Sequence, residues 1–367
     1  MNKIKEFVKK YFSGFFEKKI TLNVIRIGST LVLAPFTTNF LIEITISLIN
    51  YYLGTDIKIS RKTEEVSDAI QWGGMILGTL LILGALVFYL YSEKKKKEKR
   101  KALLQIAHSS IESVAYTNFD VDLDDYEIEQ HKISLKEELK TPNKGNLGHA
   151  IRVQSKIVQE ILQRADGRAD IEASYWGLAH VPLTFLLGYQ MADKLNTSFY
   201  EWNQDELKWN KVKEKNTSHP DLLVSKQLNQ PREEVEDVVI KIGITYPIDD
   251  TALSGLGLEG TDSYYLHISS PERNAIVSEK QLNAYQSVFR KTLDEINQSY
   301  PNLKKVHIFY SGQPSLAYRL GSCISPRMDK DIWVYNYNAT SDPKYHWSIS
   351  MKKEWDDVQI HLTGDTA

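Results

Sequence analysis

The sequence predicts two membrane-spanning α-helices at the N-terminus, followed by an α/β domain with an internal duplication. Three observations lead to this prediction: two long apolar runs in the first hundred residues, alternating strand and helix patterns after residue 146, and an order of motifs that occurs twice. A chain of 367 residues is long enough for two or three structural units. Its composition, 25% charged and 42% hydrophobic, excludes a mostly disordered protein and a polytopic transporter.

The N-terminal segment 1–19 combines aromatic and basic residues. Its apolar side chains recur at helical spacing, and its six lysines fill much of the remaining surface. This pattern predicts an amphipathic helix that lies in the cytoplasmic interface of a membrane.

Residues 20–92 contain two apolar runs, 27–53 and 69–91, joined by the polar segment 54–68. Each run is long enough to cross roughly 30 Å of hydrocarbon, which favours a transmembrane hairpin over two buried core helices. Lysine and arginine are concentrated before the first run and in a basic collar, residues 94–101, after the second. By the positive-inside rule, both termini lie in the cytoplasm and the loop lies outside.

Three polar residues of the first run, Asn39, Glu43 and Ser47, are spaced four residues apart and form one stripe on a helix. A carboxylate at membrane depth is costly unless it faces protein or water. We therefore predict that the stripe lines a pore built from several chains. A position of Glu43 near the interface, or a bond to the second span, is the alternative. In the second run, Gly74 and Gly78 form a GxxxG motif that permits close helix contact.

After the collar, the sequence predicts a linker that extends the collar over 93–145, with a short helix at 102–116, and a globular domain over 146–367. Proline, glycine and a high charge density mark the linker. In the globular domain, strand and helix patterns alternate, which is typical of an α/β domain with a mainly parallel sheet. The predicted elements are helix 149–165, strand 171–178, helix 182–195, strand 198–203, strand 238–248, strand 262–270, helix 278–300, strand 304–312, helix 314–324 and strand 331–338.

The globular domain also contains an internal repeat. The order strand, polar turn, proline, helix, glycine, aromatic strand and tryptophan occurs over 171–209 and again over 304–347. The agreement of so many elements predicts a true duplication. In parallel sheets, ligands bind beyond the carboxyl ends of the strands, so a tandem pair places two such edges across one cleft. Such a cleft suits a small ligand with several phosphates and several bases.

The turns after these strands carry groups that suit such a ligand. Hydroxyl, imidazole, amide and guanidinium groups donate hydrogen bonds to phosphates, and aromatic faces stack on bases. For each candidate, a structural role in a turn or in the core is the alternative. The candidate ligand-binding residues are Trp176, His180, Trp202, Ser270, Arg273, Ser311, Gln313, Ser315 and Tyr337.

The passage VHIFYSGQPSLAYRLGSCI, followed by DIWVYNYN and YHWSIS, resembles the closing half of the SAVED domain. That family's pattern is a strand, a small polar turn with proline, a helix carrying LAxxLG, and an aromatic strand ending in VY. The resemblance covers residues 146–363 and implies an α/β domain made of two fused CARF-like, that is Rossmann-like, halves. The turn of the first half, His180 to Pro182, departs from the type found at Gln313 to Ser315.

With two spans ahead of that domain, the chain resembles the two-transmembrane SAVED effectors of bacterial CBASS anti-phage systems. The resemblance implies a two-pass protein of the bacterial inner membrane that is not an enzyme. It also implies a cyclic oligonucleotide ligand, with a trinucleotide as first choice, made by a cGAS-like nucleotidyltransferase. Binding then promotes homo-oligomerisation through the SAVED domains, and the membrane parts disrupt the lipid bilayer. The alternatives are a CRISPR-associated membrane sensor of cyclic oligoadenylate, a membrane-anchored phosphodiesterase and a static scaffold.

The sequence argues against several other classes of protein. The chain after the collar is acidic overall, which disfavours binding of long DNA or RNA. One cysteine, Cys323, excludes disulfides within the chain and cysteine-based zinc clusters, and the scattered histidines predict no metal or other cofactor. Residues 255–260 match GxGxxG, but a strand pattern follows them, so they predict a connection between strands. Cleavage of a bound phosphodiester by His180 and Ser311 has no support beyond analogy.

Overall fold

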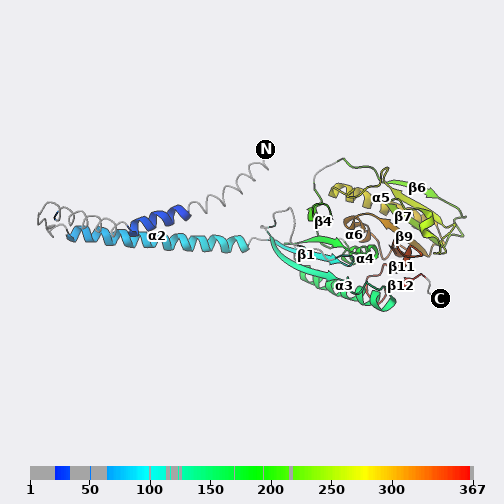
Figure 1. Cartoon of the computed structure of the whole chain (residues 1–367), viewed down its shortest axis with the longest axis horizontal. Helices are drawn as coiled ribbons and strands as arrows, with labels where there is room; N and C mark the ends of the chain where they lie inside the picture. Colours follow the sequence, from blue (N-terminus) through cyan, green and yellow to red (C-terminus); the bar gives the residue numbers. More distant parts are fainter. Residues whose placement is uncertain are drawn as a thin grey trace. The chain divides into compact units, whose positions relative to one another are not determined.

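The computed structural model describes residues 21–33, 50, 64–98, 101–112, 116, 123, 126–168, 170–192, 194–214 and 218–363. The chain divides into an N-terminal unit, Met1–Arg100, and a C-terminal unit, Lys101–Ala367 (Figure 1). The segment 1–19 and the residues Asn39, Glu43 and Ser47 lie outside the described residues. The predictions made for them therefore stay predictions.

The N-terminal unit contains a helix over Thr21–Leu33 and the long helix α2, Glu64–Glu98. Within α2, Trp72–Ser92 is the one described segment that is long and apolar enough to cross a membrane, and only 11% of its most apolar stretch is buried. A core helix of a soluble domain would be covered on its apolar side. This segment coincides with the second predicted span. Of the first predicted span, most residues lie outside the described part of the chain.

The two helices of this unit approach each other at two glycines. A Cβ atom added to Gly28 would lie 2.8 Å from the carbonyl oxygen of Gly78, and one added to Gly78 would lie 2.6 Å from that of Gly28. Both distances are shorter than Cβ contacts in real proteins, so both positions require glycine. Small residues allow membrane helices to pack backbone against backbone. The close contact predicted for Gly78 is therefore present, with Gly28 as its partner.

The C-terminal unit contains two sheets, one with the order β2-β1-β3-β4-β5 and one with the order β12-β11-β10-β9-β7-β8-β6. The strands are β1 (Lys101–Ser109), β2 (Tyr126–Ser134), β3 (Ile171–Leu178), β4 (Thr197–Asn203), β5 (Lys208–Lys211), β6 (Leu223–Gln227), β7 (Asp237–Gly243), β8 (Asp262–His267), β9 (Lys305–Ser311), β10 (Asp331–Tyr337), β11 (Tyr345–Ser350) and β12 (Ile360–Leu362). The helices are α3 (Lys144–Ala165), α4 (Val181–Met191), α5 (Glu279–Ser299) and α6 (Pro314–Ser322).

The two sheets are built by the same order of elements. The first follows β1-β2-α3-β3-α4-β4-β5, and the second follows β7-β8-α5-β9-α6-β10-β11. Among the five repeated strands of each sheet, three neighbouring pairs are parallel and the pair with the last strand, β5 or β11, is antiparallel. Strands β6 and β12 extend the second sheet at its two edges. The predicted duplication is thus present and begins at β1.

The prediction of a helix at 102–116 is wrong, and part of the predicted linker belongs to the first sheet. Strand β1 is buried from Leu103 to Ser109 between β2 and β3, and such central parallel strands have continuous apolar runs that resemble short buried helices in sequence. Strand β2 lies at the sheet edge, and its largely uncovered side chains, such as Glu127 and Glu129, contributed to the charge density that predicted a linker. Because the repeat needs both strands, we propose Lys101 rather than residue 146 as the start of this domain.

Helices α4 and α6 contact each other, and Figure 1 shows them side by side between α3 and α5. A Cβ atom added to Gly188 of α4 would overlap the carbonyl oxygen of Tyr318, and one added to Gly321 of α6 would overlap that of Phe185. Gly188 and Gly321 hold equivalent places in the repeat, as do Phe185 and Tyr318. The contact is therefore reciprocal, as a twofold relation between the halves requires. One apolar core contains side chains from both sheets.

Candidate functional site

A cleft lies at the carboxyl ends of the central strands, where the two halves of the C-terminal unit meet. On one side, two adjoining cavities of about 480 and 280 Å³ share Glu201, Trp202, Asn274 and Gln313. We call this pair the β4 cavity. On the other side, a cavity of about 630 Å³ is lined by His180, Ser311, Asn336 and Tyr337, among others. We call it the β10 cavity. Thr245 and Gly312 line both the smaller part of the β4 cavity and the β10 cavity, so the two cavities adjoin.

The β4 cavity is held in shape by Gln313, in the turn before α6. Its Oε1 accepts a hydrogen bond from the Ile276 backbone N–H at 2.5 Å, and its Nε2 donates to the Ile276 carbonyl oxygen at 3.3 Å. These bonds fix the loop between β8 and α5 against α6. At the mouth of the cavity, Arg273 is exposed and donates from Nε to the Tyr246 hydroxyl at 2.7 Å. Its remaining guanidinium donors are available to a ligand.

Glu201 of β4 lies beside the first turn of α6. Its Oε1 accepts a hydrogen bond from the Ser315 backbone N–H at 2.9 Å, so a carboxylate of the first half caps a helix of the second half. Burial raises the pKa of Glu201 to about 7, and the hydrogen bonds from Ser315 oppose that rise. Negative charge at a helix N-terminus is favourable, but here desolvation has the larger effect. The group therefore gains its full charge only above neutral pH.

In the β10 cavity, His180 is held by Ser110 from the end of β1. The Ser110 Oγ accepts the backbone N–H of His180 at 2.7 Å and lies 2.8 Å from Nδ1 of the same residue. Burial, together with nearby His346, lowers the pKa of His180 to about 4. Because its ring is neutral and the Ser110 hydroxyl is placed to donate to Nδ1, the ring proton belongs on Nε2. His180 can thus donate one hydrogen bond at neutral pH.

The two cavities are equivalent in construction. The two repeats can be aligned at the last residues of β3 and β9, Leu178 and Ser311. Continued to these strand ends, the β3–β4 and β9–β10 pairings make Trp202 equivalent to Tyr337 and Glu201 equivalent to Asn336. The β4 cavity combines the end of β4 with the first turn of α6, and the β10 cavity lies where the end of β10 faces the turn before α4. Each cavity therefore takes a strand from one half and a helix N-terminus from the other.

Of the residues predicted to bind a ligand, those that line the cleft are His180, Trp202, Arg273, Ser311, Gln313 and Tyr337. Trp176 is fully buried and stacked on Tyr200, with ring centroids 3.8 Å apart, and Ser315 is buried in the first turn of α6. Ser270 is exposed, but it is not among the residues that line the cleft. Sequence reasoning missed Glu201, Asn336 and the supporting Ser110.

The cleft residues considered for catalysis have separate partners. His180 is bonded to Ser110, whereas the Ser311 Oγ accepts the backbone N–H of Tyr246 at 3.1 Å. Within the part of the chain that the structure describes, no three or more His, Cys, Asp or Glu side chains are grouped to hold a metal ion. The glycine-rich segment 255–260 connects β7 to β8, as predicted.

Comparisons with known proteins found two matching family models. Residues 154–351 match the SAVED model, described as an SMODS-associated sensor domain that is fused to various effectors. Residues 1–109 match the model of the SAVED-fused 2TM effector domain. No curated protein matches the sequence.

Similar solved structures include Cap4 SAVED/CARF-domain containing receptors from two bacteria. The Acinetobacter baumannii receptor with the cyclic trinucleotide 2'3'3'-cAAA is 13% identical, with a TM-score of 0.46 over 79% of this chain and 61% of that one. The Moraxella osloensis receptor is 14% identical, with a TM-score of 0.40 over 83% of this chain and 63% of that one. This chain therefore spans about three fifths of the length of these receptors.

Proposed function

This chain belongs to the SAVED family of sensor domains, here joined to a 2TM effector domain, and we propose that it is a membrane effector gated by a cyclic oligonucleotide. The observation that carries the proposal is the pair of adjoining cavities between the two halves, each lined by an aromatic ring, Trp202 and Tyr337. Paired aromatic platforms suit a ligand that repeats a base. A cyclic oligonucleotide is such a ligand, and we propose a cyclic trinucleotide as the first choice.

The charges along the cleft support a ligand with phosphates. Lys211 and Lys213 line the β4 cavity, Arg273 stands at its mouth, and Lys140 lines the β10 cavity. These cations sit on a domain that is otherwise acidic. Glu201 and Asp205 also line the β4 cavity, so the cleft has local positive charges rather than an extended basic surface. This arrangement on an acidic domain favours a small anion over long nucleic acid.

Replacing Trp202 with alanine should weaken binding of a cyclic trinucleotide by about 1–3 kcal/mol, because a stacking platform is lost. The measurement is calorimetric titration of the full-length chain in lipid nanodiscs with 3'3'3'-linked cyclic tri-adenylate, followed by analysis of the recovered ligand for cleavage products. Trp355→Ala is the matched control, since Trp355 is partly exposed and packs under Arg152, away from the cleft. Equal affinities for the two variants would remove Trp202 from the site, and cleaved ligand would favour the phosphodiesterase alternative.

We propose that binding changes how the chains associate, and that the N-terminal units then permeabilise the membrane. A ligand drives such assembly only if it binds the assembled state more tightly than the separate chains. In this scheme the messenger comes from a cGAS-like nucleotidyltransferase in bacterial anti-phage defence. The chain spans the inner membrane twice with both termini in the cytoplasm, and the stripe of Asn39, Glu43 and Ser47 lines the leak.

Replacing Glu43 with leucine should abolish ligand-dependent leakage, because the stripe loses the carboxylate that stabilises water in the pore. Ligand affinity should remain unchanged. The measurement is release of an encapsulated dye from vesicles that contain the full-length chain, with and without cyclic tri-adenylate. Thr45→Leu is the control, because position 45 falls on a different side of a helix from the stripe. Full leakage with Glu43→Leu would refute the pore-lining role.

A further inference from the structure

The two halves of the cleft differ in one chemical respect. Their equivalent strand positions carry Glu201 in the β4 cavity and Asn336 in the β10 cavity. An ionised carboxylate can accept hydrogen bonds but cannot donate them, whereas an amide does both. Two cavities of the same construction therefore offer different hydrogen-bonding groups to whatever enters them.

Glu201 is placed where a phosphate would otherwise be expected. A helix N-terminus attracts anions, but at α6 the Ser315 N–H already donates to Glu201 Oε1. Lys211, which lines the same cavity, is paired with Glu214 at 3.5 Å and does not neutralise Glu201 by an ion pair. A ligand phosphate would meet a carboxylate at this point. The β4 cavity is thus unsuited to phosphate beside Glu201 and suited to the donor groups of a base.

The bases differ in what they offer to a carboxylate. Adenine, cytosine and guanine each carry an exocyclic amino group, and guanine presents a ring N–H next to it. Uracil offers one ring N–H between two carbonyl oxygens, which would repel the carboxylate. Trp202, which lines the cavity with Glu201, is partly buried and packs against Trp209 with ring centroids 5.4 Å apart. The part of its ring that lines the cavity offers an apolar surface on which any base can stack. Stacking therefore gives affinity here, and Glu201 gives selectivity.

We propose that Glu201 is a specificity-determining residue that selects an amino-bearing base for the β4 cavity, with guanine as the best match. The inference rests on the proposed function. Asn336 makes the β10 cavity tolerant of bases that present either donors or acceptors. A cyclic ligand must then place one amino-bearing base at Glu201, while its other bases are less restricted.

The test is made at about pH 8.5, where the Glu201 carboxyl is ionised. It compares three 3'3'3'-linked rings on the full-length chain in nanodiscs: cyclic tri-uridylate, the same ring with one uridine replaced by adenosine, and cyclic tri-adenylate. One adenosine should restore most of the affinity, because the ring can turn to place it at Glu201. We expect the mixed ring to bind the unchanged chain roughly 10- to 100-fold more tightly than tri-uridylate. Glu201→Gln should reduce this ratio to within about threefold, since an amide can serve either base.

Two further variants make the result decisive. Glu201→Asp keeps the charge and should keep the preference for the mixed ring. Glu160→Gln, on the exposed face of α3, should change neither the affinity for tri-uridylate nor that for the mixed ring. A ratio that Glu201→Gln leaves intact would overturn the inference. Equal tightening of all rings by Glu201→Gln would also overturn it, because the carboxylate would then act only by repelling phosphates, while the proposed function would stand. If no ring bound any variant, both proposals would fail.

Discussion

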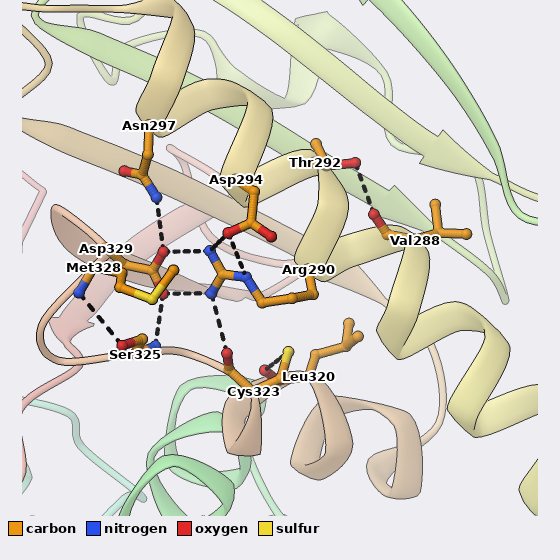
Figure 2. Close-up of polar contacts among 10 residues, drawn as sticks. All are labelled: Val288, Arg290, Thr292, Asp294, Asn297, Leu320, Cys323, Ser325, Met328 and Asp329. Atoms are coloured by element: carbon orange, nitrogen blue, oxygen red, sulfur yellow. Dashed lines mark hydrogen bonds and ion pairs between the residues drawn. The ribbon is translucent and has the colours of Figure 1, made fainter.

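Replacing Arg290 with methionine is expected to lower the free energy of unfolding of the C-terminal unit by about 3–5 kcal/mol, because it leaves a buried carboxylate without its counter-ion. Arg290 of α5 donates two hydrogen bonds to Asp329, Nη2 to Oδ1 at 2.5 Å and Nη1 to Oδ2 at 2.6 Å (Figure 2). The Asp329 side chain is only 1% exposed. Methionine keeps the apolar stem of the arginine, so the change removes the charge and its hydrogen bonds but leaves most of the packing.

Asp329 accepts further hydrogen bonds, and in the Arg290 variant their donors would surround an unpaired negative charge. Asn297 Nδ2 donates to its Oδ1 at 2.8 Å, and the Ser325 backbone N–H donates to its Oδ2 at 2.6 Å. Figure 2 shows these groups converging on the carboxylate, with Arg290 also reaching the Cys323 carbonyl oxygen. The cluster thereby ties the C-terminal end of α6 to α5. Since α6 begins at the cleft, this cluster holds the far end of the helix that shapes the β4 cavity.

The matched control is Arg168→Met. Arg168 also forms a two-bond pair with a carboxylate, that of Asp170, at 3.2 and 2.8 Å, but both side chains are exposed. Exposed pairs contribute little to stability because water screens them, so this variant should unfold almost as the unchanged chain does. Urea unfolding of each full-length variant in detergent, monitored by tyrosine and tryptophan fluorescence, gives its free energy of unfolding. Similar losses for the two variants would contradict the buried-pair argument.

Most elements of the C-terminal unit could be predicted because their patterns are local. The helix predicted from residue 278 is present as α5, and the Ser278 side chain caps it by accepting the Gln281 N–H. Strand β3 has the same bounds in the prediction and the structure. Strand β1 could not be recognised in this way, because it is defined by its neighbours in the sheet, which lie far away in sequence. A short apolar run alone does not separate a strand from a helix.

The candidate site was predictable where it follows from topology. Residues in the turns after β3 and β9, such as His180 and Gln313, were found because ligands bind at that edge. Trp176 was selected for its place near the end of β3, but Tyr200 of the neighbouring strand covers its face. Glu201 was missed because a carboxylate is not expected where an anion is sought. Aligning the two repeats in register would have drawn attention to it as the partner of Asn336.

The reciprocal contact of α4 and α6 carries the second large effect. Replacing either Gly188 or Gly321 with alanine should cost about 3 kcal/mol of stability, because each new methyl group meets a carbonyl oxygen of the facing helix rather than a flexible side chain. Overlap with backbone is relieved only by moving the helices apart. The two substitutions act on one contact, so the double variant should lose less than the sum of the single losses.

Gly148→Ala in α3 tests whether this loss comes from the helix crossing or from glycine replacement in general. A Cβ atom at Gly148 would lie 3.8 Å from Ile360, an ordinary contact, so alanine should be neutral or stabilise the helix by roughly 0.5–1 kcal/mol. Moving α6 away from α4 should also displace Gln313 and the Ser315 N–H, which shape the β4 cavity at the start of α6. Gly321→Ala is therefore expected to weaken cyclic tri-adenylate binding as well as folding. Unchanged stability in both single variants would mean that the halves do not share this tight crossing.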